Sequence, residues 1–188
     1  IEADLSNAGA FIGAALVTGG RVTIANWPET TDQAGDAWNW LVPAFGGSVE
    51  RDGDNAIFTG PETLSGITAD LHEVGELTPV VAAIAAFADT ESTLTGVAHL
   101  RGHETDRLRA LTNEFNSLGG SVTQLADRLH IAPAPLHDGT FHTYDDHRLA
   151  HAAVIVALKT PGVLVENIGT TAKTYPEFAD AWTEMLRA

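Results

Sequence analysis

Cysteine is absent from the 188 residues of this sequence, and basic side chains are few. Without cysteine there is no disulfide framework, no thiolate nucleophile and no zinc–thiolate site, which fits a cytoplasmic protein. The chain has 10 Lys and Arg but 25 Asp and Glu, and the resulting net charge of −15 argues against nucleic acid and anionic membrane surfaces as partners. The longest apolar run, residues 80–88, is far shorter than the roughly 20 residues that span a bilayer.

The overall amino-acid composition is typical of a folded domain. Hydrophobic residues make up 44% of the chain and charged residues 19%, which is typical of globular proteins rather than disordered ones. A length of 188 residues fits one domain with a sizeable core, so we predict a single domain over residues 1–188.

One pattern of elements recurs along the chain: strand, apolar helix, strand, amphipathic helix, and a hairpin of two strands. The first copy lacks its leading strand and is predicted at 5–17, 21–25, 33–45 and 48–59. The second is predicted at 66–71, 78–88, 92–95, 104–118 and 121–132, with Thr78 as N-cap and Pro79 as the first helical residue. The third, predicted at 141–144, 148–158, 162–165 and 176–186, lacks its hairpin.

The repeat predicts the architecture. Equivalent helices of two units end in similar sequences, Phe45-Gly46-Gly47-Ser48-Val49 and Leu118-Gly119-Gly120-Ser121-Val122. The repeat is therefore visible in residue identity as well as in the order of elements. One helix of each unit is apolar almost all round, which indicates burial on every side. We therefore predict an inside-out α/β domain of three pseudo-symmetric βαβαββ units with buried helices and outer sheets; a helix layer in a two-layer α/β sandwich is the alternative. We expect residues outside this sequence to complete the third unit.

The stretch Arg101 to Arg107 concentrates two of the scarce basic residues where a helix is predicted to start. Acidic residues suit this position because the amide groups of a helix N-terminus are positive, whereas Arg107 is unfavourable there unless an anion lies close by. The alternative is a surface ion pair between Arg107 and Glu104 at i, i+3.

Other charged residues also precede helices, and a threefold repeat would bring these helix N-termini to one end of the domain. They are Glu76, Asp145, Asp146, Arg148 and Lys173. Two Arg, one Lys and several helix N-termini would form an anion site suited to phosphate and carboxylate groups, with carboxylates available for proton transfer. Taken singly, Glu76 could favour a helix dipole, Asp145 or Asp146 could be an N-cap, and Lys173 could be a solvated lysine.

Histidines suggest a competing metal site. His147 and His151 stand at i, i+4 beside two aspartates, a spacing that can bind a metal from one helix face. Residue 148 is Arg where a metalloprotease helix would carry Glu, and an Arg repels a cation. We therefore predict no functional metal.

Several motifs resemble those of the 5-enolpyruvylshikimate-3-phosphate synthase family, in the same order and with compatible spacing. They are Glu2-Ala3-Asp4-Leu5-Ser6-Asn7-Ala8, Gly75-Glu76-Leu77-Thr78, Gly102-His103-Glu104-Thr105-Asp106-Arg107-Leu108, Tyr144-Asp145-Asp146-His147-Arg148-Leu149-Ala150 and Thr171-Ala172-Lys173-Thr174-Tyr175-Pro176. The resemblance implies the C-terminal-side domain of an enzyme with two similar inside-out domains, in which the other domain and the extreme N-terminus lie outside this sequence.

The resemblance also implies a reaction and its residues. The family transfers the enolpyruvyl group of phosphoenolpyruvate to the 5-hydroxyl of shikimate 3-phosphate, releases phosphate, and uses neither metal nor organic cofactor; the step belongs to chorismate and aromatic amino acid biosynthesis. By resemblance, Arg107, Arg148 and Lys173 bind phosphoenolpyruvate. Glu76 is the base on the sugar hydroxyl, and Glu104 takes part in proton transfer.

Further positions follow from the same resemblance. Glu76, His99 and His103 would contact shikimate 3-phosphate, with Asp146 and His147 in supporting roles. Many members carry Asp at position 76, Lys at 103 and Asn at 99, so these contacts differ from the family pattern. The related transferase of cell-wall synthesis fits less well, because it usually carries a catalytic cysteine. The alternative function is an isolated domain that folds and at most binds phosphoenolpyruvate weakly without its partner domain.

Overall fold

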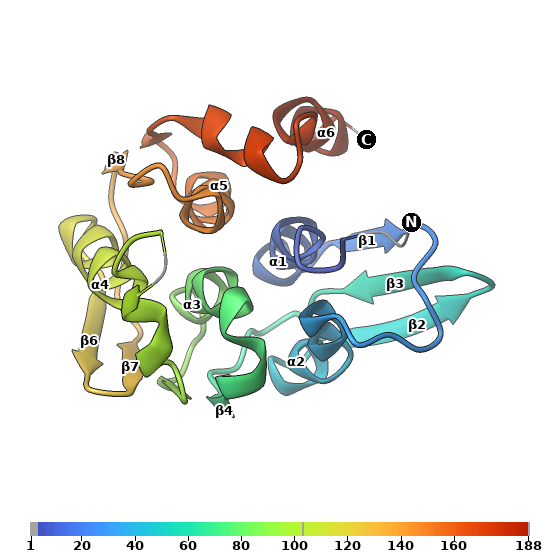
Figure 1. Ribbon diagram of the computed structural model, residues 1–188, viewed down its shortest axis with the longest axis horizontal. Coiled ribbons are helices and arrows are strands. Elements are labelled where there is room, and N and C mark those ends of the chain that lie inside the picture. The colour runs from blue at the N-terminus through green and yellow to red at the C-terminus, as the bar shows by residue number, and fades with distance from the viewer. Residues whose placement is uncertain (1–3, 103, 188) are drawn as a thin grey trace.

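Figure 1 shows the computed structural model, which describes residues 4–102 and 104–187. The first unit comprises α1 (Gly9–Thr18), β1 (Arg21–Ile24), the 3-10 helix η1 (Ala34–Ala37), α2 (Trp38–Ala44), β2 (Ser48–Asp52) and β3 (Asn55–Thr59). The second comprises β4 (Thr68–Asp70), η2 (His72–Leu77), α3 (Thr78–Ala85), β5 (Ser92–Thr95), η3 (Ala98–Gly102), α4 (Arg107–Ser117), β6 (Ser121–Leu125) and β7 (Arg128–Ala132). The third comprises β8 (Gly139–Phe141), α5 (His147–Lys159), β9 (Val163–Val165), η4 (Ile168–Lys173) and α6 (Phe178–Met185).

The strand pairing repeats from unit to unit. The second unit forms a four-stranded sheet of order β4-β5-β7-β6, in which β4 and β5 are parallel and the β6–β7 hairpin is antiparallel. The first unit has the corresponding order β1-β3-β2. The third has the parallel pair β8-β9. Within the described residues, the first unit therefore lacks a counterpart of β4 and the third lacks the hairpin, as the sequence predicts.

Three helices form the core and the sheets lie outside them. In Figure 1, α1, α3 and α5 lie at the centre and the strands lie at the periphery. These helices pack on one another, and every residue of α3 is buried. Gly13 allows a close approach, because a Cβ on it would stand 2.5 Å from Ile155 Cδ1. Central helices with apolar side chains buried on all sides and sheets outside them form the inside-out arrangement, and the predicted fold class is confirmed.

Several predicted helix starts are wrong by a few residues. Helix α4 begins at Arg107, where Asp106 accepts a hydrogen bond from the Arg109 amide at 3.0 Å, so Glu104 lies before the helix. Thr78 is not an N-cap, because the 3-10 turn η2 leads directly into α3. Helix α6 begins after Pro176, at Phe178. Before α4 and α6, irregular residues take up positions that the sequence pattern assigns to the helix, whereas α3 begins one residue earlier than predicted because η2 runs into it.

The predicted helix 33–45 is divided in the structure. Residues Ala34–Ala37 form 3-10 turns, and only Trp38–Ala44 are α-helical, with Pro43 inside the last turn. The face predicted to be apolar is buried, since Trp38, Leu41 and Phe45 are all 0% exposed. In the described part of the chain, no helix is long and apolar enough to cross a membrane.

Candidate anion-binding active site

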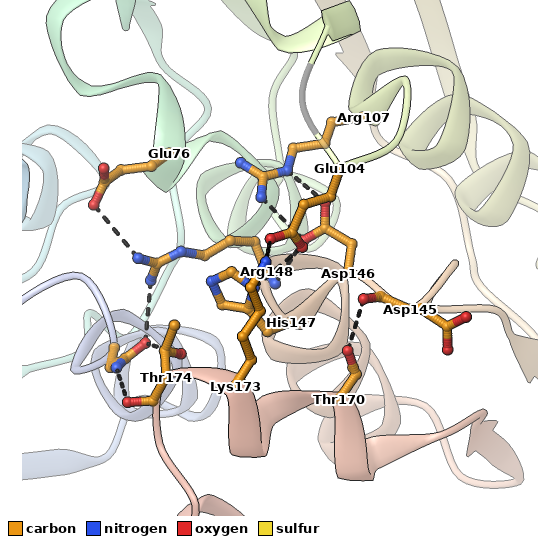
Figure 2. A network of polar contacts seen from close by, with 11 residues as sticks. Glu76, Glu104, Arg107, Asp145, Asp146, His147, Arg148, Thr170, Lys173 and Thr174 are labelled. Carbon is orange, nitrogen blue, oxygen red and sulfur yellow. Dashed lines mark hydrogen bonds and ion pairs between the residues drawn. The ribbon is translucent and has the colours of Figure 1, made fainter.

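The predicted site residues meet where the polypeptide enters its helices. Figure 2 shows seven of them in one network of polar contacts: Glu76, Glu104, Arg107, Asp146, His147, Arg148 and Lys173. They come from η2, the segment before α4, the starts of α4 and α5, and the end of η4. The convergence predicted from the threefold repeat is therefore present in the structure.

A buried ion pair lies at the centre of the network. Arg107 Nε donates to Asp146 Oδ2 at 2.7 Å, and Nη2 donates to Oδ1 at 3.1 Å. The two side chains are 4% and 0% exposed. Parallel hydrogen bonds of this kind fix the planar guanidinium in orientation as well as position. The surface pair of Arg107 with Glu104, the alternative from sequence, is wrong, because Arg107 bonds across the fold to the third unit.

Asp146 also sets the start of α5. Its Oδ1 accepts a hydrogen bond from the backbone amide of Arg148 at 2.9 Å, which makes it the N-cap of that helix. One buried carboxylate therefore bonds to the Arg107 side chain and to the Arg148 backbone. The predicted N-cap role and the predicted place in the site are two functions of the same residue.

The Arg148 guanidinium has looser contacts. Nη1 lies 3.3 Å from Asn7 Oδ1, and Nη2 lies 3.5 Å from Glu76 Oε1. Burial lowers the pKa of Arg148, Glu76 opposes this shift, and the charge of Arg107 adds to the lowering. Two guanidinium groups close enough to repel each other favour an anion between them.

Glu104 and Lys173 form the exposed part of the site. Their side chains make an ion pair, with Lys173 58% exposed and Glu104 28% exposed. In Figure 2, Lys173 extends from η4 toward Glu104. Exposed ion pairs contribute little to stability, so the ammonium group can exchange this partner for a ligand at small cost.

Glu76 lies on the other side of Arg148 and is also accessible. Its side chain is 43% exposed, and Oε1 accepts a hydrogen bond from the Ser6 hydroxyl. A carboxylate that touches both a hydroxyl and a guanidinium stays near its partners yet faces solvent. This is the placement expected of a group that takes a proton from a ligand hydroxyl.

The two histidines of α5 are buried neutral groups. Burial lowers the pKa of His151 to about 3, and burial followed by the charge of Arg148 lowers the pKa of His147. His147 Nδ1 lies 3.3 Å from Glu104 Oε2 but outside hydrogen-bond geometry. The His151 ring packs on Phe178 with a centroid distance of 4.6 Å.

The metal alternative can be compared with this geometry. Among the described residues, one group of three has the spacing of metal ligands: Glu104, Asp146 and His147, with ligand atoms within 4.8 Å of one another. It does not include His151, which the i, i+4 hypothesis requires. Both oxygens of Asp146 bond to Arg107, and Glu104 pairs with Lys173, so a cation would have to displace two basic side chains.

The predicted shikimate-phosphate residues are only partly described. His99 lies in η3, and its ring packs edge-to-face on His72 with a centroid distance of 5.5 Å. A Cβ on Gly75 would stand 2.2 Å from His99 Nε2, so the glycine before Glu76 leaves room for this ring. His103 lies outside the described residues. His99 therefore neighbours the segment that carries Glu76.

Sequence reasoning missed Ser6, Asn7 and Thr174 as site residues. Asn7 is buried, and its Nδ2 donates to Asp4 Oδ2 at 2.9 Å. Its Oδ1 accepts from Arg148 and, at 3.3 Å, from the Thr174 hydroxyl. Their position could have indicated a place in the site, because Ser6 and Asn7 lie just before the first buried helix, as Glu76 lies just before the second.

Known proteins match the chain over almost its whole length. Residues 1–182 match the family described as EPSP synthase (3-phosphoshikimate 1-carboxyvinyltransferase). A 3-phosphoshikimate 1-carboxyvinyltransferase of Kocuria rhizophila (strain ATCC 9341 / DSM 348 / NBRC 103217 / DC2201) is 54% identical over 187 residues, which are 99% of this chain and 42% of that protein.

Solved structures agree in fold. An EPSP synthase from Acinetobacter baumannii superposes with a TM-score of 0.85 at 23% identity, over 98% of this chain and 46% of that one. The enolpyruvyl transferase NikO from Streptomyces tendae gives a TM-score of 0.74 at 18% identity, over 98% and 43%. The chain thus spans less than half the length of these proteins. From the family match over residues 1–182, we conclude that it belongs to the EPSP synthase family.

Proposed function

We propose that this chain is the C-terminal-side domain of a two-domain enzyme. The enzyme transfers the enolpyruvyl group of phosphoenolpyruvate to the 5-hydroxyl of shikimate 3-phosphate and releases phosphate, a step of the shikimate pathway. The second domain, outside this sequence, supplies the rest of the shikimate 3-phosphate pocket. The reaction as proposed needs no cofactor and takes place where other enzymes of amino acid biosynthesis work, in the cytoplasm.

One observation carries the proposal: a buried carboxylate, Asp146, holds Arg107 by its side chain and Arg148 by its backbone amide. Two cations positioned in this way, with Lys173 beside them, suit a ligand that carries both a phosphate and a carboxylate. We assign phosphoenolpyruvate to these three side chains. The overall charge of −15 does not oppose this assignment, because the potential of a site depends on its nearest charges.

The chemistry then requires three proton transfers: one to C3, one from the hydroxyl and one from C3. A proton adds to the C3 methylene of phosphoenolpyruvate, which gives C2 cationic character, and the 5-hydroxyl oxygen attacks C2 while losing its proton to a base. The tetrahedral intermediate breaks the C2–O bond to phosphate and loses a proton from C3, which restores the double bond. We assign Glu76 as the base on the hydroxyl and Glu104 as the group at C3.

Supporting roles follow from the contacts. Asp146 orients the Arg107 guanidinium and fixes the helix start that carries Arg148, and neutral His147 lies beside Glu104 without adding a positive charge there. We place His99 near shikimate 3-phosphate because it packs beside the segment of Glu76. His103 belongs to the same proposal by family resemblance.

A titration of the isotope-labelled chain with phosphoenolpyruvate tests the half-site. Saturable amide shifts at residues 104–107, 146–148 and 173 are expected if the cations are preassembled. A dispersed spectrum without shifts would favour the alternative, in which the domain folds but binds only with its partner. Turnover is tested separately on the full-length protein by phosphate release with both substrates, and its absence there would contradict the proposed reaction.

A further inference from the structure

The loop from His142 to Asp146 joins β8 to α5 and has an unusual backbone. Tyr144 and Asp145 both have φ of 55°, in the left-handed region. Asp tolerates this conformation, but a bulky residue such as Tyr adopts it rarely, because of steric strain. Two such residues in succession persist only where the surrounding structure holds them. The next residues along the chain are Asp146, His147 and Arg148.

Glu114 of α4 holds the first half of this loop. Its Oε1 accepts a hydrogen bond from the Tyr144 hydroxyl at 2.6 Å. Its Oε2 accepts one from the His142 amide at 2.8 Å and lies 3.0 Å from His142 Nδ1. The carboxylate is buried although Tyr144 itself is 42% exposed. Partial burial and then the bond to Glu114 raise the pKa of Tyr144 above its ordinary value.

The second half of the loop is held from two sides. Arg107 precedes Glu114 by two helical turns on the same face of α4, and its guanidinium donates hydrogen bonds to both carboxylate oxygens of Asp146. From the other side, Asn167 Nδ2 donates to Asp145 Oδ1 at 2.7 Å, and the Thr170 hydroxyl donates to the Asp145 carbonyl at 2.8 Å. Figure 2 shows Thr170 in this contact.

These contacts tie together the segments that carry the three cations. Arg107 belongs to α4, Arg148 to α5, and Lys173 to η4, which also contains Thr170. Each of these three segments is hydrogen-bonded to a residue of the loop 142–146. A shift of this loop would therefore change the spacing of the cations, and misplacement by about 1 Å can cost roughly a hundredfold in rate.

We propose that Glu114 is a positioning residue of this enzyme: it holds the left-handed loop at Tyr144 and so sets the distance between Arg107 and Arg148. The proposal rests on the proposed function for its kinetic readout, but not for its structural one. Glu114 touches no ligand in this scheme. Its effect passes through the loop to the two guanidinium groups.

The test compares variants of the full-length protein at a temperature where all are folded. Glu114→Ala is expected to raise the KM for phosphoenolpyruvate roughly tenfold and to lower kcat. Glu114→Gln keeps an acceptor for the His142 amide and a donor for the Tyr144 oxygen, so it should stay within about twofold of wild type. Tyr144→Phe removes one partly exposed hydrogen bond and should raise this KM about threefold without endangering the fold.

A control separates positioning from general destabilisation. Leu129→Ala in β7 truncates a buried side chain of the same unit and is expected to lower the melting temperature without changing this KM. An unchanged KM in Glu114→Ala, or an equal rise in Leu129→Ala, would overturn the proposal. So would equal damage in Glu114→Gln and Glu114→Ala, because the hydrogen bonds would then not be the cause.

A second readout does not depend on activity. The Nε–H of Arg107 should exchange slowly with solvent, since it donates to buried Asp146 at 2.7 Å. In Glu114→Ala this side-chain NMR signal is expected to shift and exchange faster, and in Leu129→Ala at the same temperature it should not. If the wild-type protein lacks turnover, the proposed function fails while this signal still decides whether Glu114 positions the loop.

Discussion

Two ion pairs of the site, Arg107–Asp146 and Lys173–Glu104, differ in burial. Arg107 and Asp146 are 4% and 0% exposed and joined by two hydrogen bonds, whereas Lys173 and Glu104 are 58% and 28% exposed. A buried pair must stay paired because either charge alone is costly, but an exposed pair can separate into water. The buried pair therefore belongs to the fold, and the exposed pair is free to respond to a ligand. The site combines a fixed cation with an exchangeable one.

Removal of the buried carboxylate should have the largest effect. Asp146→Ala leaves Arg107 charged and unpaired in the interior and removes the N-cap of α5, so we expect the free energy of unfolding to fall by about 3–5 kcal/mol. Urea denaturation measures this change. Asp106→Ala is the matched control, since it removes the N-cap of α4 and only a partly exposed contact with Arg101 at 3.5 Å. The control should lose about 1 kcal/mol; equal losses would mean that the buried pair adds nothing beyond a cap.

Arg148 should matter more for binding than for stability. Its contacts to Asn7 and Glu76 are 3.3–3.5 Å long, so the fold depends on it less than on Arg107. Arg148→Ala in the full-length protein is expected to raise the KM for phosphoenolpyruvate on the order of a hundredfold. Arg109→Ala removes the same charge from an exposed position of α4 and should leave this KM unchanged. An unchanged KM and kcat in Arg148→Ala would contradict the assignment of this residue.

The fold was largely predictable because its signals are local. Apolar helices alternate with amphipathic ones, and glycines close equivalent helices, so the three units and the buried core follow from the sequence. The hairpins over 48–59 and 121–132 also lie where the pattern predicts them. Helix starts were less predictable, because short 3-10 turns lie between the strands and the starts of α3 and α4.

The site was predictable in its members but not in its pairing. The repeat alone brings Glu76, Arg107 and Arg148 to one end of the domain. It does not reveal that Arg107 bonds to Asp146, because 39 residues separate them and a closer carboxylate, Glu104, was available as a partner. Asn7 was missed for the same reason, since its bond to Arg148 spans 141 residues. Such contacts depend on how the units pack.

His151 makes the stability of the domain depend on pH. It is 0% exposed, and burial lowers its pKa from 6.5 to about 3. The unfolded chain binds the proton more readily, so the stability from neutral His151 is fully present above pH 6.5 and is lost as the pH falls toward 3. Between pH 6.5 and 5 the loss is about 2 kcal/mol.

The variant His151→Met tests this contribution. Urea unfolding of both proteins at pH 7 and pH 5 should show a smaller loss of stability in the variant, by about 2 kcal/mol. Met fills a similar apolar space and does not titrate. Parallel pH profiles of the two proteins would mean that protonation of His151 is not what destabilises the domain in acid.

The exposed pair should give the smallest change in stability. Lys173→Met is expected to alter the free energy of unfolding by less than about 1 kcal/mol, because solvent replaces the lost partner of Glu104. Phosphoenolpyruvate binding should nevertheless weaken, since the ammonium group is assigned to the ligand. Lys159→Met is the control, because this second lysine lies in the last turn of α5, away from the helix start that carries Arg148.

If Lys173→Met destabilised the domain as much as Asp146→Ala, the distinction between a fixed and an exchangeable cation would be wrong. If it left both stability and binding unchanged, Lys173 would be a solvated surface residue, and the site would bind its anion with the two arginines alone.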